Sequence, residues 1–376
     1  MEGALFAFGT ASLLAFLHPY LSYPASLLLF ARRPVRLDSG APEPSAALVF
    51  CAYNEEKSLG DKLANVEALK QRRPALDVLA YSDMSTDRTL EMLEARPDLL
   101  RAVPATQRTG KASGMRRLTS MIDADVVIFT DANVILDPES LKVLLAYFSD
   151  PAVGGVAGSL HYVNPGESTT AGVGSLYWRL EETIKRLESR SGSTMGADGS
   201  IFAVRRAFYP IVPAHLLDDL TVSMTMIFEG LRLVSAPDVH AYERGAASSG
   251  DEFRRKRRIA CRAFNTHRHL WPKIRKLGAL DVYKYVSHKL IRWFGVVWLG
   301  LAAVSFTLAL ALAGWGGLAL APGVLAAALV YLGLKLDLPV ISPAAEVGRS
   351  IWATFLGVTD ALRGRTYQTW TPATSR

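Results

Sequence analysis

Short apolar runs alternate with amphipathic stretches through the first third of the chain. Four of these runs are typical of strands: 46–52, 76–81, 100–103 and 126–128, the last of them apolar and β-branched throughout. Helical patterns follow them, opening at Tyr53-Asn54-Glu55-Glu56, after Asp87 and at Gly110-Lys111. Strands that alternate with helices predict a parallel sheet covered by helices on both faces.

The second half of the chain is less regular. Its pattern predicts strands at 153–160, 201–204 and 231–235, an amphipathic helix at 176–187, and a further helix starting at 217–220. A glycine-rich loop, 193–199, precedes the second of these strands, and small polar residues at 246–250 suggest a mobile loop. The basic run 254–258 follows, interleaved with apolar residues.

Two long stretches carry no Asp, Glu, Lys or Arg at all. One lies between Glu2 and Arg32 and the other between Arg292 and Lys335. Because about 20 apolar residues span a bilayer, the first fits one crossing and the second fits two, joined near 314–317. A cleaved signal peptide is the competing interpretation of the first stretch. It is the weaker one, since no Lys or Arg precedes the apolar run and the run is too long.

Basic residues flank these stretches and orient the chain: Arg32, Arg33, Arg36, Lys284, Lys289, Arg292 and Lys335. Positive flanks remain in the cytoplasm, so we expect an integral protein of a bacterial inner membrane whose large middle region is cytoplasmic. The net charge of +7 suits membrane lipids or an anionic substrate. Nucleic acid is not expected as a partner, because the membrane spans already explain the basic flanks.

These patterns divide the chain into six expected segments: a transmembrane helix (1–31), a linker (32–45), an α/β domain (46–245), basic interfacial helices (246–290), a transmembrane hairpin (291–336) and a cytoplasmic or interfacial end (337–376). The two cysteines, Cys51 and Cys261, both fall in the cytoplasmic part. We therefore expect neither a disulfide nor a zinc site.

Polar residues follow successive predicted strands, where open α/β sheets bind ligands. Asp131 ends the strand at 126–128, and Asn133 leaves the chain on the same side two residues later. This pair suits a hard cation, Mg²⁺ or Mn²⁺, and the alternative is a strand end capped by polar residues. Asp137 is the expected N-cap of the next helix, with Pro138 at its first position.

Three further groups have two interpretations each. Asp219, beside Asp218, is either the general base of a reaction or a helix N-cap. Asp198, before Gly199, either contacts an acceptor or closes a turn. Arg257 and Arg258, in the basic run, either clamp phosphate or face lipid, and both can hold.

Taken in order, these motifs resemble glycosyltransferase family 2, in particular membrane-embedded members such as cellulose and hyaluronan synthases. The resemblance implies a GT-A, Rossmann-like fold and assigns a role to each motif. It implies nucleotide binding by Ala52, Tyr53, Asn54, Glu55, Asp83 (on the uracil or ribose), Lys111 and Asp131, metal binding by Asp131 and Asn133, and base catalysis by Asp219. Beside the resemblance, the residues themselves suggest Arg257 and Arg258 for the nucleotide, and Asp198, Gly199 and Asp218 for the acceptor. Trp370-Thr371-Pro372 resembles the ending of several members.

The sequence departs from those synthases in two places. The second position of the metal motif is Asn133, which keeps an oxygen ligand but loses a charge. No Gln-x-x-Arg-Trp occurs, and 252–258 takes its place, which puts processive synthesis in doubt. A related subgroup of membrane transferases carries such an arginine-rich helix, followed by Ser-His-Lys as in Ser287-His288-Lys289.

The sequence therefore predicts an inverting, metal-dependent membrane glycosyltransferase that transfers a sugar from a nucleotide sugar, with UDP as the expected nucleotide, to a glycan or polysaccharide. Two alternatives stay open. One is transfer of a single sugar to a lipid acceptor, such as a polyprenyl phosphate or a ceramide-like lipid. The other is a non-catalytic scaffold that binds nucleotide sugars, suggested by Asn133.

Overall fold

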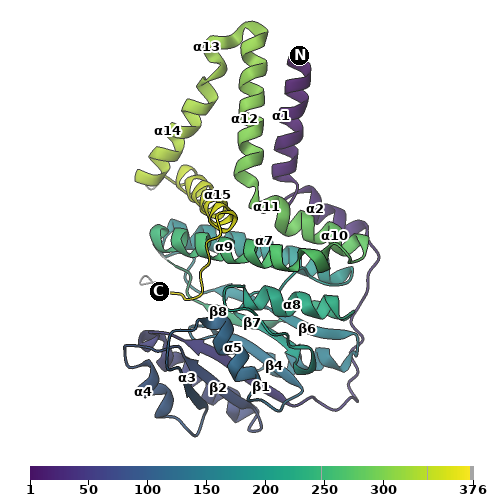
Figure 1. Ribbon diagram of the computed structural model, residues 1–376, viewed down its shortest axis with the longest axis vertical. Coiled ribbons are helices and arrows are strands. Elements are labelled where there is room, and N and C mark those ends of the chain that lie inside the picture. Colours follow the sequence, from purple (N-terminus) through teal and green to yellow (C-terminus); the bar gives the residue numbers. More distant parts are fainter. Residues whose placement is uncertain (247, 337, 373–376) are drawn as a thin grey trace.

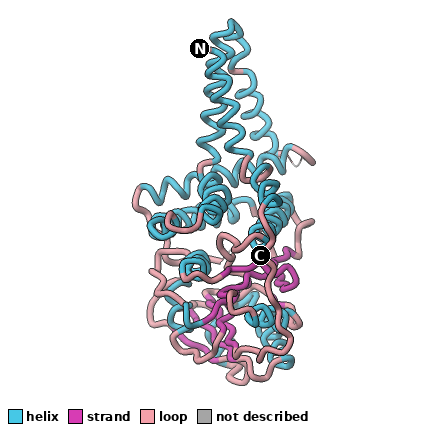
Figure 2. Tube along the Cα trace, turned by 90° about the vertical axis from the view of Figure 1, so that its right-hand side faces the viewer, coloured by secondary structure: helices cyan, strands magenta, loops and turns pink. Residues whose placement is uncertain are grey.

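The computed structural model describes residues 1–246, 248–336 and 338–372, and it stacks three layers (Figure 1). A stalk of apolar helices stands on a middle layer of helices, and this layer lies on an α/β domain. The view turned by 90° shows the same order, with the strands confined to the end opposite the stalk (Figure 2). The site described below lies between the sheet and the middle layer.

One mixed sheet forms the centre of the α/β domain. Its strands are β1 (Ala46–Ala52), β2 (Asp77–Ser82), β3 (Arg101–Pro104), β4 (Val126–Asp131), β5 (Ile135–Leu136), β6 (Val153–Tyr162), β7 (Ile201–Arg205) and β8 (Arg232–Glu243), in the order β3-β2-β1-β4-β7-β6-β8-β5. The first four strands of that order are parallel, as predicted. The sheet as a whole is mixed, because β7 is antiparallel to both β4 and β6. Ile201, the first residue of β7, pairs with Thr130 near the carboxyl end of β4, so the loop before β7 ends at that edge and the strand must run back from it.

Helices cover both faces of the sheet. Along β1, Leu48 and Phe50 pack with α3 (Glu56–Arg72), α4 (Thr89–Glu94) and α6 (Ser140–Ala146). The alternate side chains of β1 pack with α5 (Lys111–Thr119) and α8 (Asp218–Phe228). This alternation follows from the two-residue period of a strand, which explains why every position of 47–52 is buried.

The expected cap of α6 is wrong. The helix begins at Ser140 with Glu139 as its N-cap. Asp137 instead closes a turn, in which its Oδ1 accepts from the Glu139 N–H at 3.0 Å. Its own N–H donates to the carbonyl of His240, so this residue still belongs to the sheet edge and the helix starts later.

The middle layer consists of α7 (Thr169–Arg190), α9 (Ser249–Ile274), α10 (Ala279–Tyr285), the π-helical turn η4 (Val286–Leu290), α11 (Ile291–Trp293) and α15 (Ile341–Leu362). The last of these lies along α9, and a side chain at Gly357 would collide with the α9 backbone. The mobile loop expected at 246–250 is partly wrong, because Ser249 and Gly250 belong to α9. Ala247 lies outside the described residues.

The stalk is built from α1 (Glu2–Leu17), α12 (Gly295–Leu310), α13 (Gly316–Ala319) and α14 (Ala321–Lys335), and α2 (Ser22–Ser26) joins it to the middle layer. Only one helix of the described chain is long and apolar enough to span a membrane, at 295–319. A second candidate exists if the two N-terminal helical segments, 2–17 and 22–29, which bend by 69° at the break between them, count as one span. The expectation of three spans is therefore not confirmed, since the apolar part of α14 is too short to qualify.

Candidate active site

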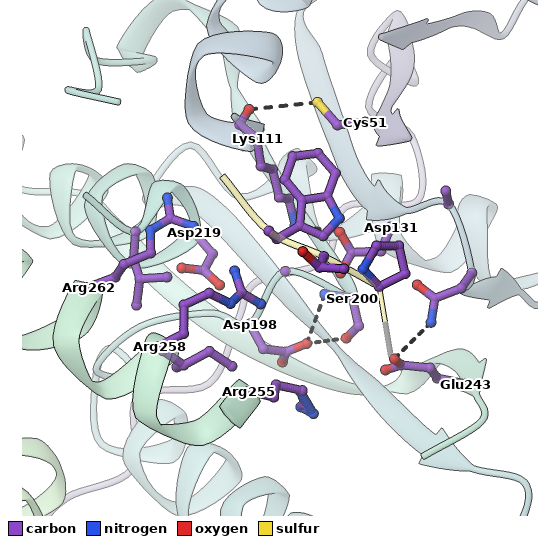
Figure 3. Close-up of a pocket in the computed structure, with 18 of the residues that line it drawn as sticks. Cys51, Lys111, Asp131, Asp198, Ser200, Asp219, Glu243, Arg255, Arg258 and Arg262 are labelled. Carbon is purple, nitrogen blue, oxygen red and sulfur yellow. Dashed lines mark hydrogen bonds and ion pairs between the residues drawn. The ribbon is translucent and has the colours of Figure 1, made fainter. Parts of the chain in front are cut away.

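A cavity of about 780 Å³ lies at the carboxyl ends of β1 and β4, under the basic helix α9 (Figure 3). It is lined by most of the predicted site residues: Glu55, Lys111, Asp131, Asn133, Asp198, Gly199, Asp218, Asp219, Arg257 and Arg258. Ala52, Tyr53, Asn54 and Asp83 are not among the lining residues. The structure thus brings the predicted metal, base and acceptor residues together, and of the predicted residues at 52–55 and Asp83 only Glu55 lines the same cavity.

Lys111 and Asp131 form the centre of the site. The Lys111 Nζ lies 2.5 Å from Asp131 Oδ1, at the N-terminus of α5 and the carboxyl end of β4. Burial alone would lower the pKa of Lys111, but the charges of Asp131, Asp218 and Asp219 raise it well above its usual value. The lysine is therefore a fixed cation, placed where it can attract a diphosphate.

Gly199 allows the loop before β7 to approach these charged groups. A Cβ atom on this residue would lie 2.7 Å from Lys111 Nζ and 3.4 Å from Asp219 Oδ2. Any side chain would have to push the ammonium or the carboxylate away. The loop backbone, Lys111 and Asp219 therefore surround one small space.

Asp218 and Asp219 occupy the first turn of α8, whose N-cap is Leu217, so the N-cap interpretation of this pair is wrong. Asp218 is buried, and its Oδ1 lies 3.8 Å from Arg262 Nη2. Burial and the neighbouring charge of Asp218 raise the pKa of Asp219 to about 7, against the opposing effect of Lys111. A carboxylate that accepts a proton near neutral pH suits a general base.

Asn133 has a carboxylate partner that the sequence analysis did not include. Its Nδ2 donates to Glu243 Oε1 at 2.9 Å, and Glu243 stands at the end of β8. The donor atom of the amide is therefore occupied, and Oδ1 is the atom that can serve as a metal ligand. Glu243 also adds a negative charge beside the position where Asn replaces the Asp of the synthases.

Asp83, which is expected on the nucleoside, also has partners within the protein. Its fully buried carboxylate accepts from the Thr109 N–H at 2.7 Å, the Gly110 N–H at 3.1 Å and Arg108 Nε at 3.2 Å. These bonds occupy both oxygens of the carboxylate. Asp83 thereby fixes the turn that leads into α5 and positions Lys111.

The remaining nucleoside residues are also engaged. Asn54 adopts φ +52° and exchanges hydrogen bonds with Thr86, linking the loops that follow β1 and β2. Arg108 stacks on Tyr53, with its guanidinium carbon 3.2 Å from the ring centroid, and donates to the carbonyl of Trp370 at 2.9 Å. The C-terminal residues therefore lie against the predicted base-binding side, where Ala52 ends β1.

Two other predicted residues have partners within the protein. Arg257 forms a two-pronged ion pair with Asp360 of α15, at 2.7 and 3.0 Å, which directs its guanidinium toward α15. Asp198 accepts from Lys185 Nζ at 2.8 Å and from Ser200, as the turn-closing interpretation expects. Its carboxylate still lines the cavity.

Sequence reasoning missed several residues that line the cavity: Glu243, Arg255, Arg262 and the C-terminal residues Tyr367, Thr369, Trp370, Thr371 and Pro372. The strand prediction for β8 stopped at Ser235, because Pro237 and Asp238 interrupt the apolar pattern, so Glu243 was not recognised as a strand-end carboxylate. Trp370 was noted only for its resemblance to the ending of other proteins. Its contacts with Tyr53 and Arg108, which are distant in sequence, are evident only in the folded chain.

Together, a Rossmann-like sheet, a strand-end acid, a paired lysine and a raised-pKa aspartate define a glycosyltransferase with a GT-A fold. The comparison of sequences places the chain within that class. Residues 42–261 match the family described as glycosyltransferase like family 2, and the chain belongs to this family.

Individual relatives agree with this assignment. The poly-β-1,6-N-acetyl-D-glucosamine synthase of Staphylococcus aureus is 24% identical over 198 residues, covering 50% of this chain and 47% of the relative. Protein RfbJ of Shigella flexneri is 27% identical over 112 residues, covering 29% of this chain and 82% of the relative. The chain thus spans about half the length of the first relatives it matches.

A similar solved structure covers nearly the whole chain. The mannosyltransferase PcManGT from Pyrobaculum calidifontis, solved in complex with GDP-mannose and Mn²⁺, superposes with a TM-score of 0.73. The alignment covers 96% of this chain and 99% of that one, at 21% sequence identity. This likeness shows the fold, including the helical layers above the sheet.

Proposed function

We propose that the protein transfers a sugar from a nucleoside diphosphate sugar to a glycan acceptor at the cytoplasmic face of a bacterial inner membrane, with inversion at the anomeric carbon. The observation that carries this proposal is the convergence of Lys111, Asp131 and Asp219 around Gly199. One cavity therefore contains candidate residues for stabilising an anionic leaving group, for binding a cation and for acting as the base.

The chain's own residues fit a divalent cation. Asp131 offers a carboxylate, and Asn133 offers an amide oxygen whose orientation Glu243 fixes. Hard oxygen donors of this kind suit Mg²⁺ or Mn²⁺, and the similar mannosyltransferase was solved with Mn²⁺. When bound, the cation would neutralise charge that develops on the leaving diphosphate.

Asp219 is the proposed base for the acceptor hydroxyl. Its ionised form takes the hydroxyl proton at a carboxylate oxygen while the acceptor oxygen forms the new bond to the anomeric carbon and the diphosphate departs. Lys111 stabilises the departing negative charge. No second carboxylate is needed as a nucleophile, so one displacement with inversion follows.

Arg258 is the proposed diphosphate clamp, because Arg257 is held by Asp360 and Arg258 points into the cavity (Figure 3). We expect Arg258→Ala to cost about 2–4 kcal/mol of transition-state stabilisation, the range of a lost electrostatic donor. The measurement is kcat/KM in detergent. Arg257→Ala is the matched control and should lower Tm with a smaller change in kcat/KM, because its partner lies in α15. Equal losses in kcat/KM for the two variants would remove this assignment.

The direct test of the function uses purified protein in detergent and a panel of UDP- and GDP-sugars, with released nucleotide as the readout. UDP was the expectation from sequence, and the similar structure holds GDP-mannose, so both belong in the panel. Release from one donor supports an enzyme and excludes the non-catalytic scaffold. Release from none, with Mn²⁺ and native membranes present, would contradict the proposal.

The acceptor alternatives are separated by the product. Incorporation of labelled sugar into a glycan of increasing length supports a polysaccharide or glycan acceptor. A single labelled glycolipid supports transfer to a lipid acceptor. The departure from Gln-x-x-Arg-Trp remains the sequence feature that favours short products.

A further inference from the structure

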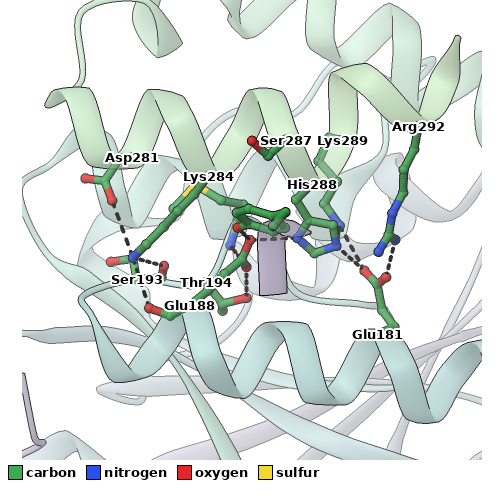
Figure 4. Close-up of polar contacts among 12 residues, drawn as sticks. Glu181, Glu188, Ser193, Thr194, Asp281, Lys284, Ser287, His288, Lys289 and Arg292 are labelled. Carbon is green, nitrogen blue, oxygen red and sulfur yellow. Dashed lines mark hydrogen bonds and ion pairs between the residues drawn. The ribbon is translucent and has the colours of Figure 1, made fainter. Parts of the chain in front are cut away.

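The segment Ser287-His288-Lys289 lies outside the cavity, on the π-helical turn η4, which packs against α7 (Figure 4). None of the three residues lines the cavity. A π-helical turn is rare and frequently marks a functional site. The proposed chemistry uses none of these side chains, so their burial and charge need another explanation.

His288 bridges two carboxylates of α7. Its Nδ1 lies 2.8 Å from Glu188 Oε1, and its Nε2 lies 2.7 Å from Glu181 Oε1. Each ring nitrogen therefore has one carboxylate of α7 as its hydrogen-bond partner. Lys289 Nζ lies 3.1 Å from the same Glu181 oxygen, and its longer 3.3 Å approach to Nε2 follows from sharing that oxygen.

Both carboxylates are ionised in spite of their burial. Burial alone would raise the pKa of Glu181 and of Glu188. His288 and Lys289 outweigh burial at both residues, and the pKa of each glutamate lies below its usual value. Arg292, whose Nη1 lies 2.6 Å from Glu181 Oε2, adds to this effect at Glu181.

The second oxygen of Glu188 holds the loop that leads to the active site. Glu188 Oε2 accepts from the Thr194 hydroxyl at 3.0 Å and from the Met195 N–H at 2.9 Å. Lys284 donates to the carbonyls of Glu188 and Ser193 at 2.9 and 3.2 Å. His288 and Lys284, one helical turn apart, therefore hold the end of α7 and the start of the loop.

The same loop ends inside the cavity four residues after Met195. Gly196 adopts φ +110°, and the Ala197 N–H donates to Ser223 of α8 at 3.1 Å. Asp198 is held by Lys185, again from α7. Gly199 then packs against Lys111 and Asp219. Helix α7 thus contacts the loop at both ends.

Residues at the base of the N-terminal stalk also contact this network. The Tyr23 hydroxyl of α2 donates to Glu188. His18, just after α1, contacts the Ser287 hydroxyl at 3.0 Å, and Ser26 pairs with the Tyr283 hydroxyl at 2.6 Å. The glutamate that holds the active-site loop is therefore tied to the N-terminal stalk as well.

We propose that His288 is a positioning residue for sugar transfer, acting through Glu188 to hold the loop 193–199 so that Asp198 and Gly199 receive the acceptor. This inference rests on the proposed function. A buried ionic network is weak evidence for stability, because desolvation offsets its attraction. The proposed role of this network is to fix the position of the loop 193–199, which lies on the acceptor side of the cavity.

The test compares transfer with hydrolysis in native membranes that contain the full chain, using radiolabelled nucleotide sugar. The readout is the ratio of free sugar released to sugar incorporated into lipid or glycan, which does not depend on the fraction of folded protein. We expect His288→Gln to raise this ratio by about tenfold, since small misplacements at a reacting centre cost up to about 10²-fold. Binding of UDP or GDP with Mn²⁺ should stay near the wild-type value.

His267→Gln is the matched control. His267 is also buried in the middle layer, where it contacts the Tyr285 hydroxyl at 3.2 Å and packs among aromatic rings. A purely structural role for His288 predicts that both variants lower transfer and hydrolysis together. An unchanged ratio in His288→Gln would therefore overturn the proposal.

Thr194→Val provides a second route that leaves η4 intact. It removes the hydroxyl that donates to Glu188 from the loop side, so it should also raise the ratio. The double variant with His288→Gln should show less than the product of the two effects, because both act through one carboxylate. Independent, multiplicative effects would contradict the proposal. If wild-type membranes neither release nucleotide nor incorporate sugar, the proposed function itself fails.

Discussion

An Asp219→Asn variant should lose sugar transfer by about 10²–10⁴-fold, the contribution typical of a general base. The amide is close in size to the carboxylate, and it can still accept the Leu220 N–H that Asp219 Oδ1 accepts at 2.6 Å. Folding and nucleotide binding should therefore persist. Calorimetry with UDP or GDP and turnover on the same preparation separate the two properties. Turnover near the wild-type rate would exclude Asp219 from the mechanism.

The pH dependence follows from the same residue. The pKa of Asp219 is raised to about 7, and only the ionised carboxylate can accept a proton. Activity should therefore fall as the pH drops below about 7 and reach a plateau above it. Asp218→Asn is the informative control, because removing its charge should lower the pKa of Asp219 and shift the acidic limb to lower pH. A limb that does not move would show that another group controls the profile.

An Asp131→Ala variant should lose both turnover and metal-dependent nucleotide binding. We expect at least about a hundredfold loss of turnover, since a cation at a departing diphosphate supplies several kcal/mol of stabilisation. The change also leaves Lys111 without its 2.5 Å partner. The measurement is calorimetric titration with UDP or GDP at several Mn²⁺ concentrations, beside released nucleotide.

Asn133→Asp is the companion variant for the metal site. It should retain activity and bind the cation more tightly, because it adds an anionic oxygen ligand. Its gain should be limited by repulsion from Glu243, which now accepts from the Asn133 amide. Full wild-type activity in excess chelator would show that the cation is unnecessary, and the role assigned to Asp131 would fall with it.

The sequence was most informative where a signal is local. The apolar run 46–52 coincides with β1, Asp131 ends β4 and Lys111 begins α5. Each of these follows from a few neighbouring residues that switch from a buried strand to a helix start. Since strand ends of a parallel sheet gather at one edge, their convergence in one cavity was also predictable.

What the sequence did not reveal depends on distant partners. Arg257 could not be told from Arg258 until Asp360, far along the chain, was seen to pair with it. The part that Asp83 has in holding another loop was not evident, because its backbone partners, Thr109 and Gly110, are distant in sequence. The direction of β7 depends on where in space the preceding loop ends. The alternation of side chains along the sequence carries no information on this position.

The ion pair between Lys111 and Asp131 would make the two proposed ionic ligands, a divalent cation and a nucleoside diphosphate, thermodynamically dependent on one another. A divalent cation that arrives alone must compete with the ammonium for the same carboxylate. A nucleoside diphosphate attracts that ammonium and so releases the carboxylate. Each ligand should therefore raise the affinity for the other, and by linkage the two factors are equal. Weak binding of Mn²⁺ to the free protein is then the expected behaviour of an intact site, and titrations should be judged only when nucleotide is present.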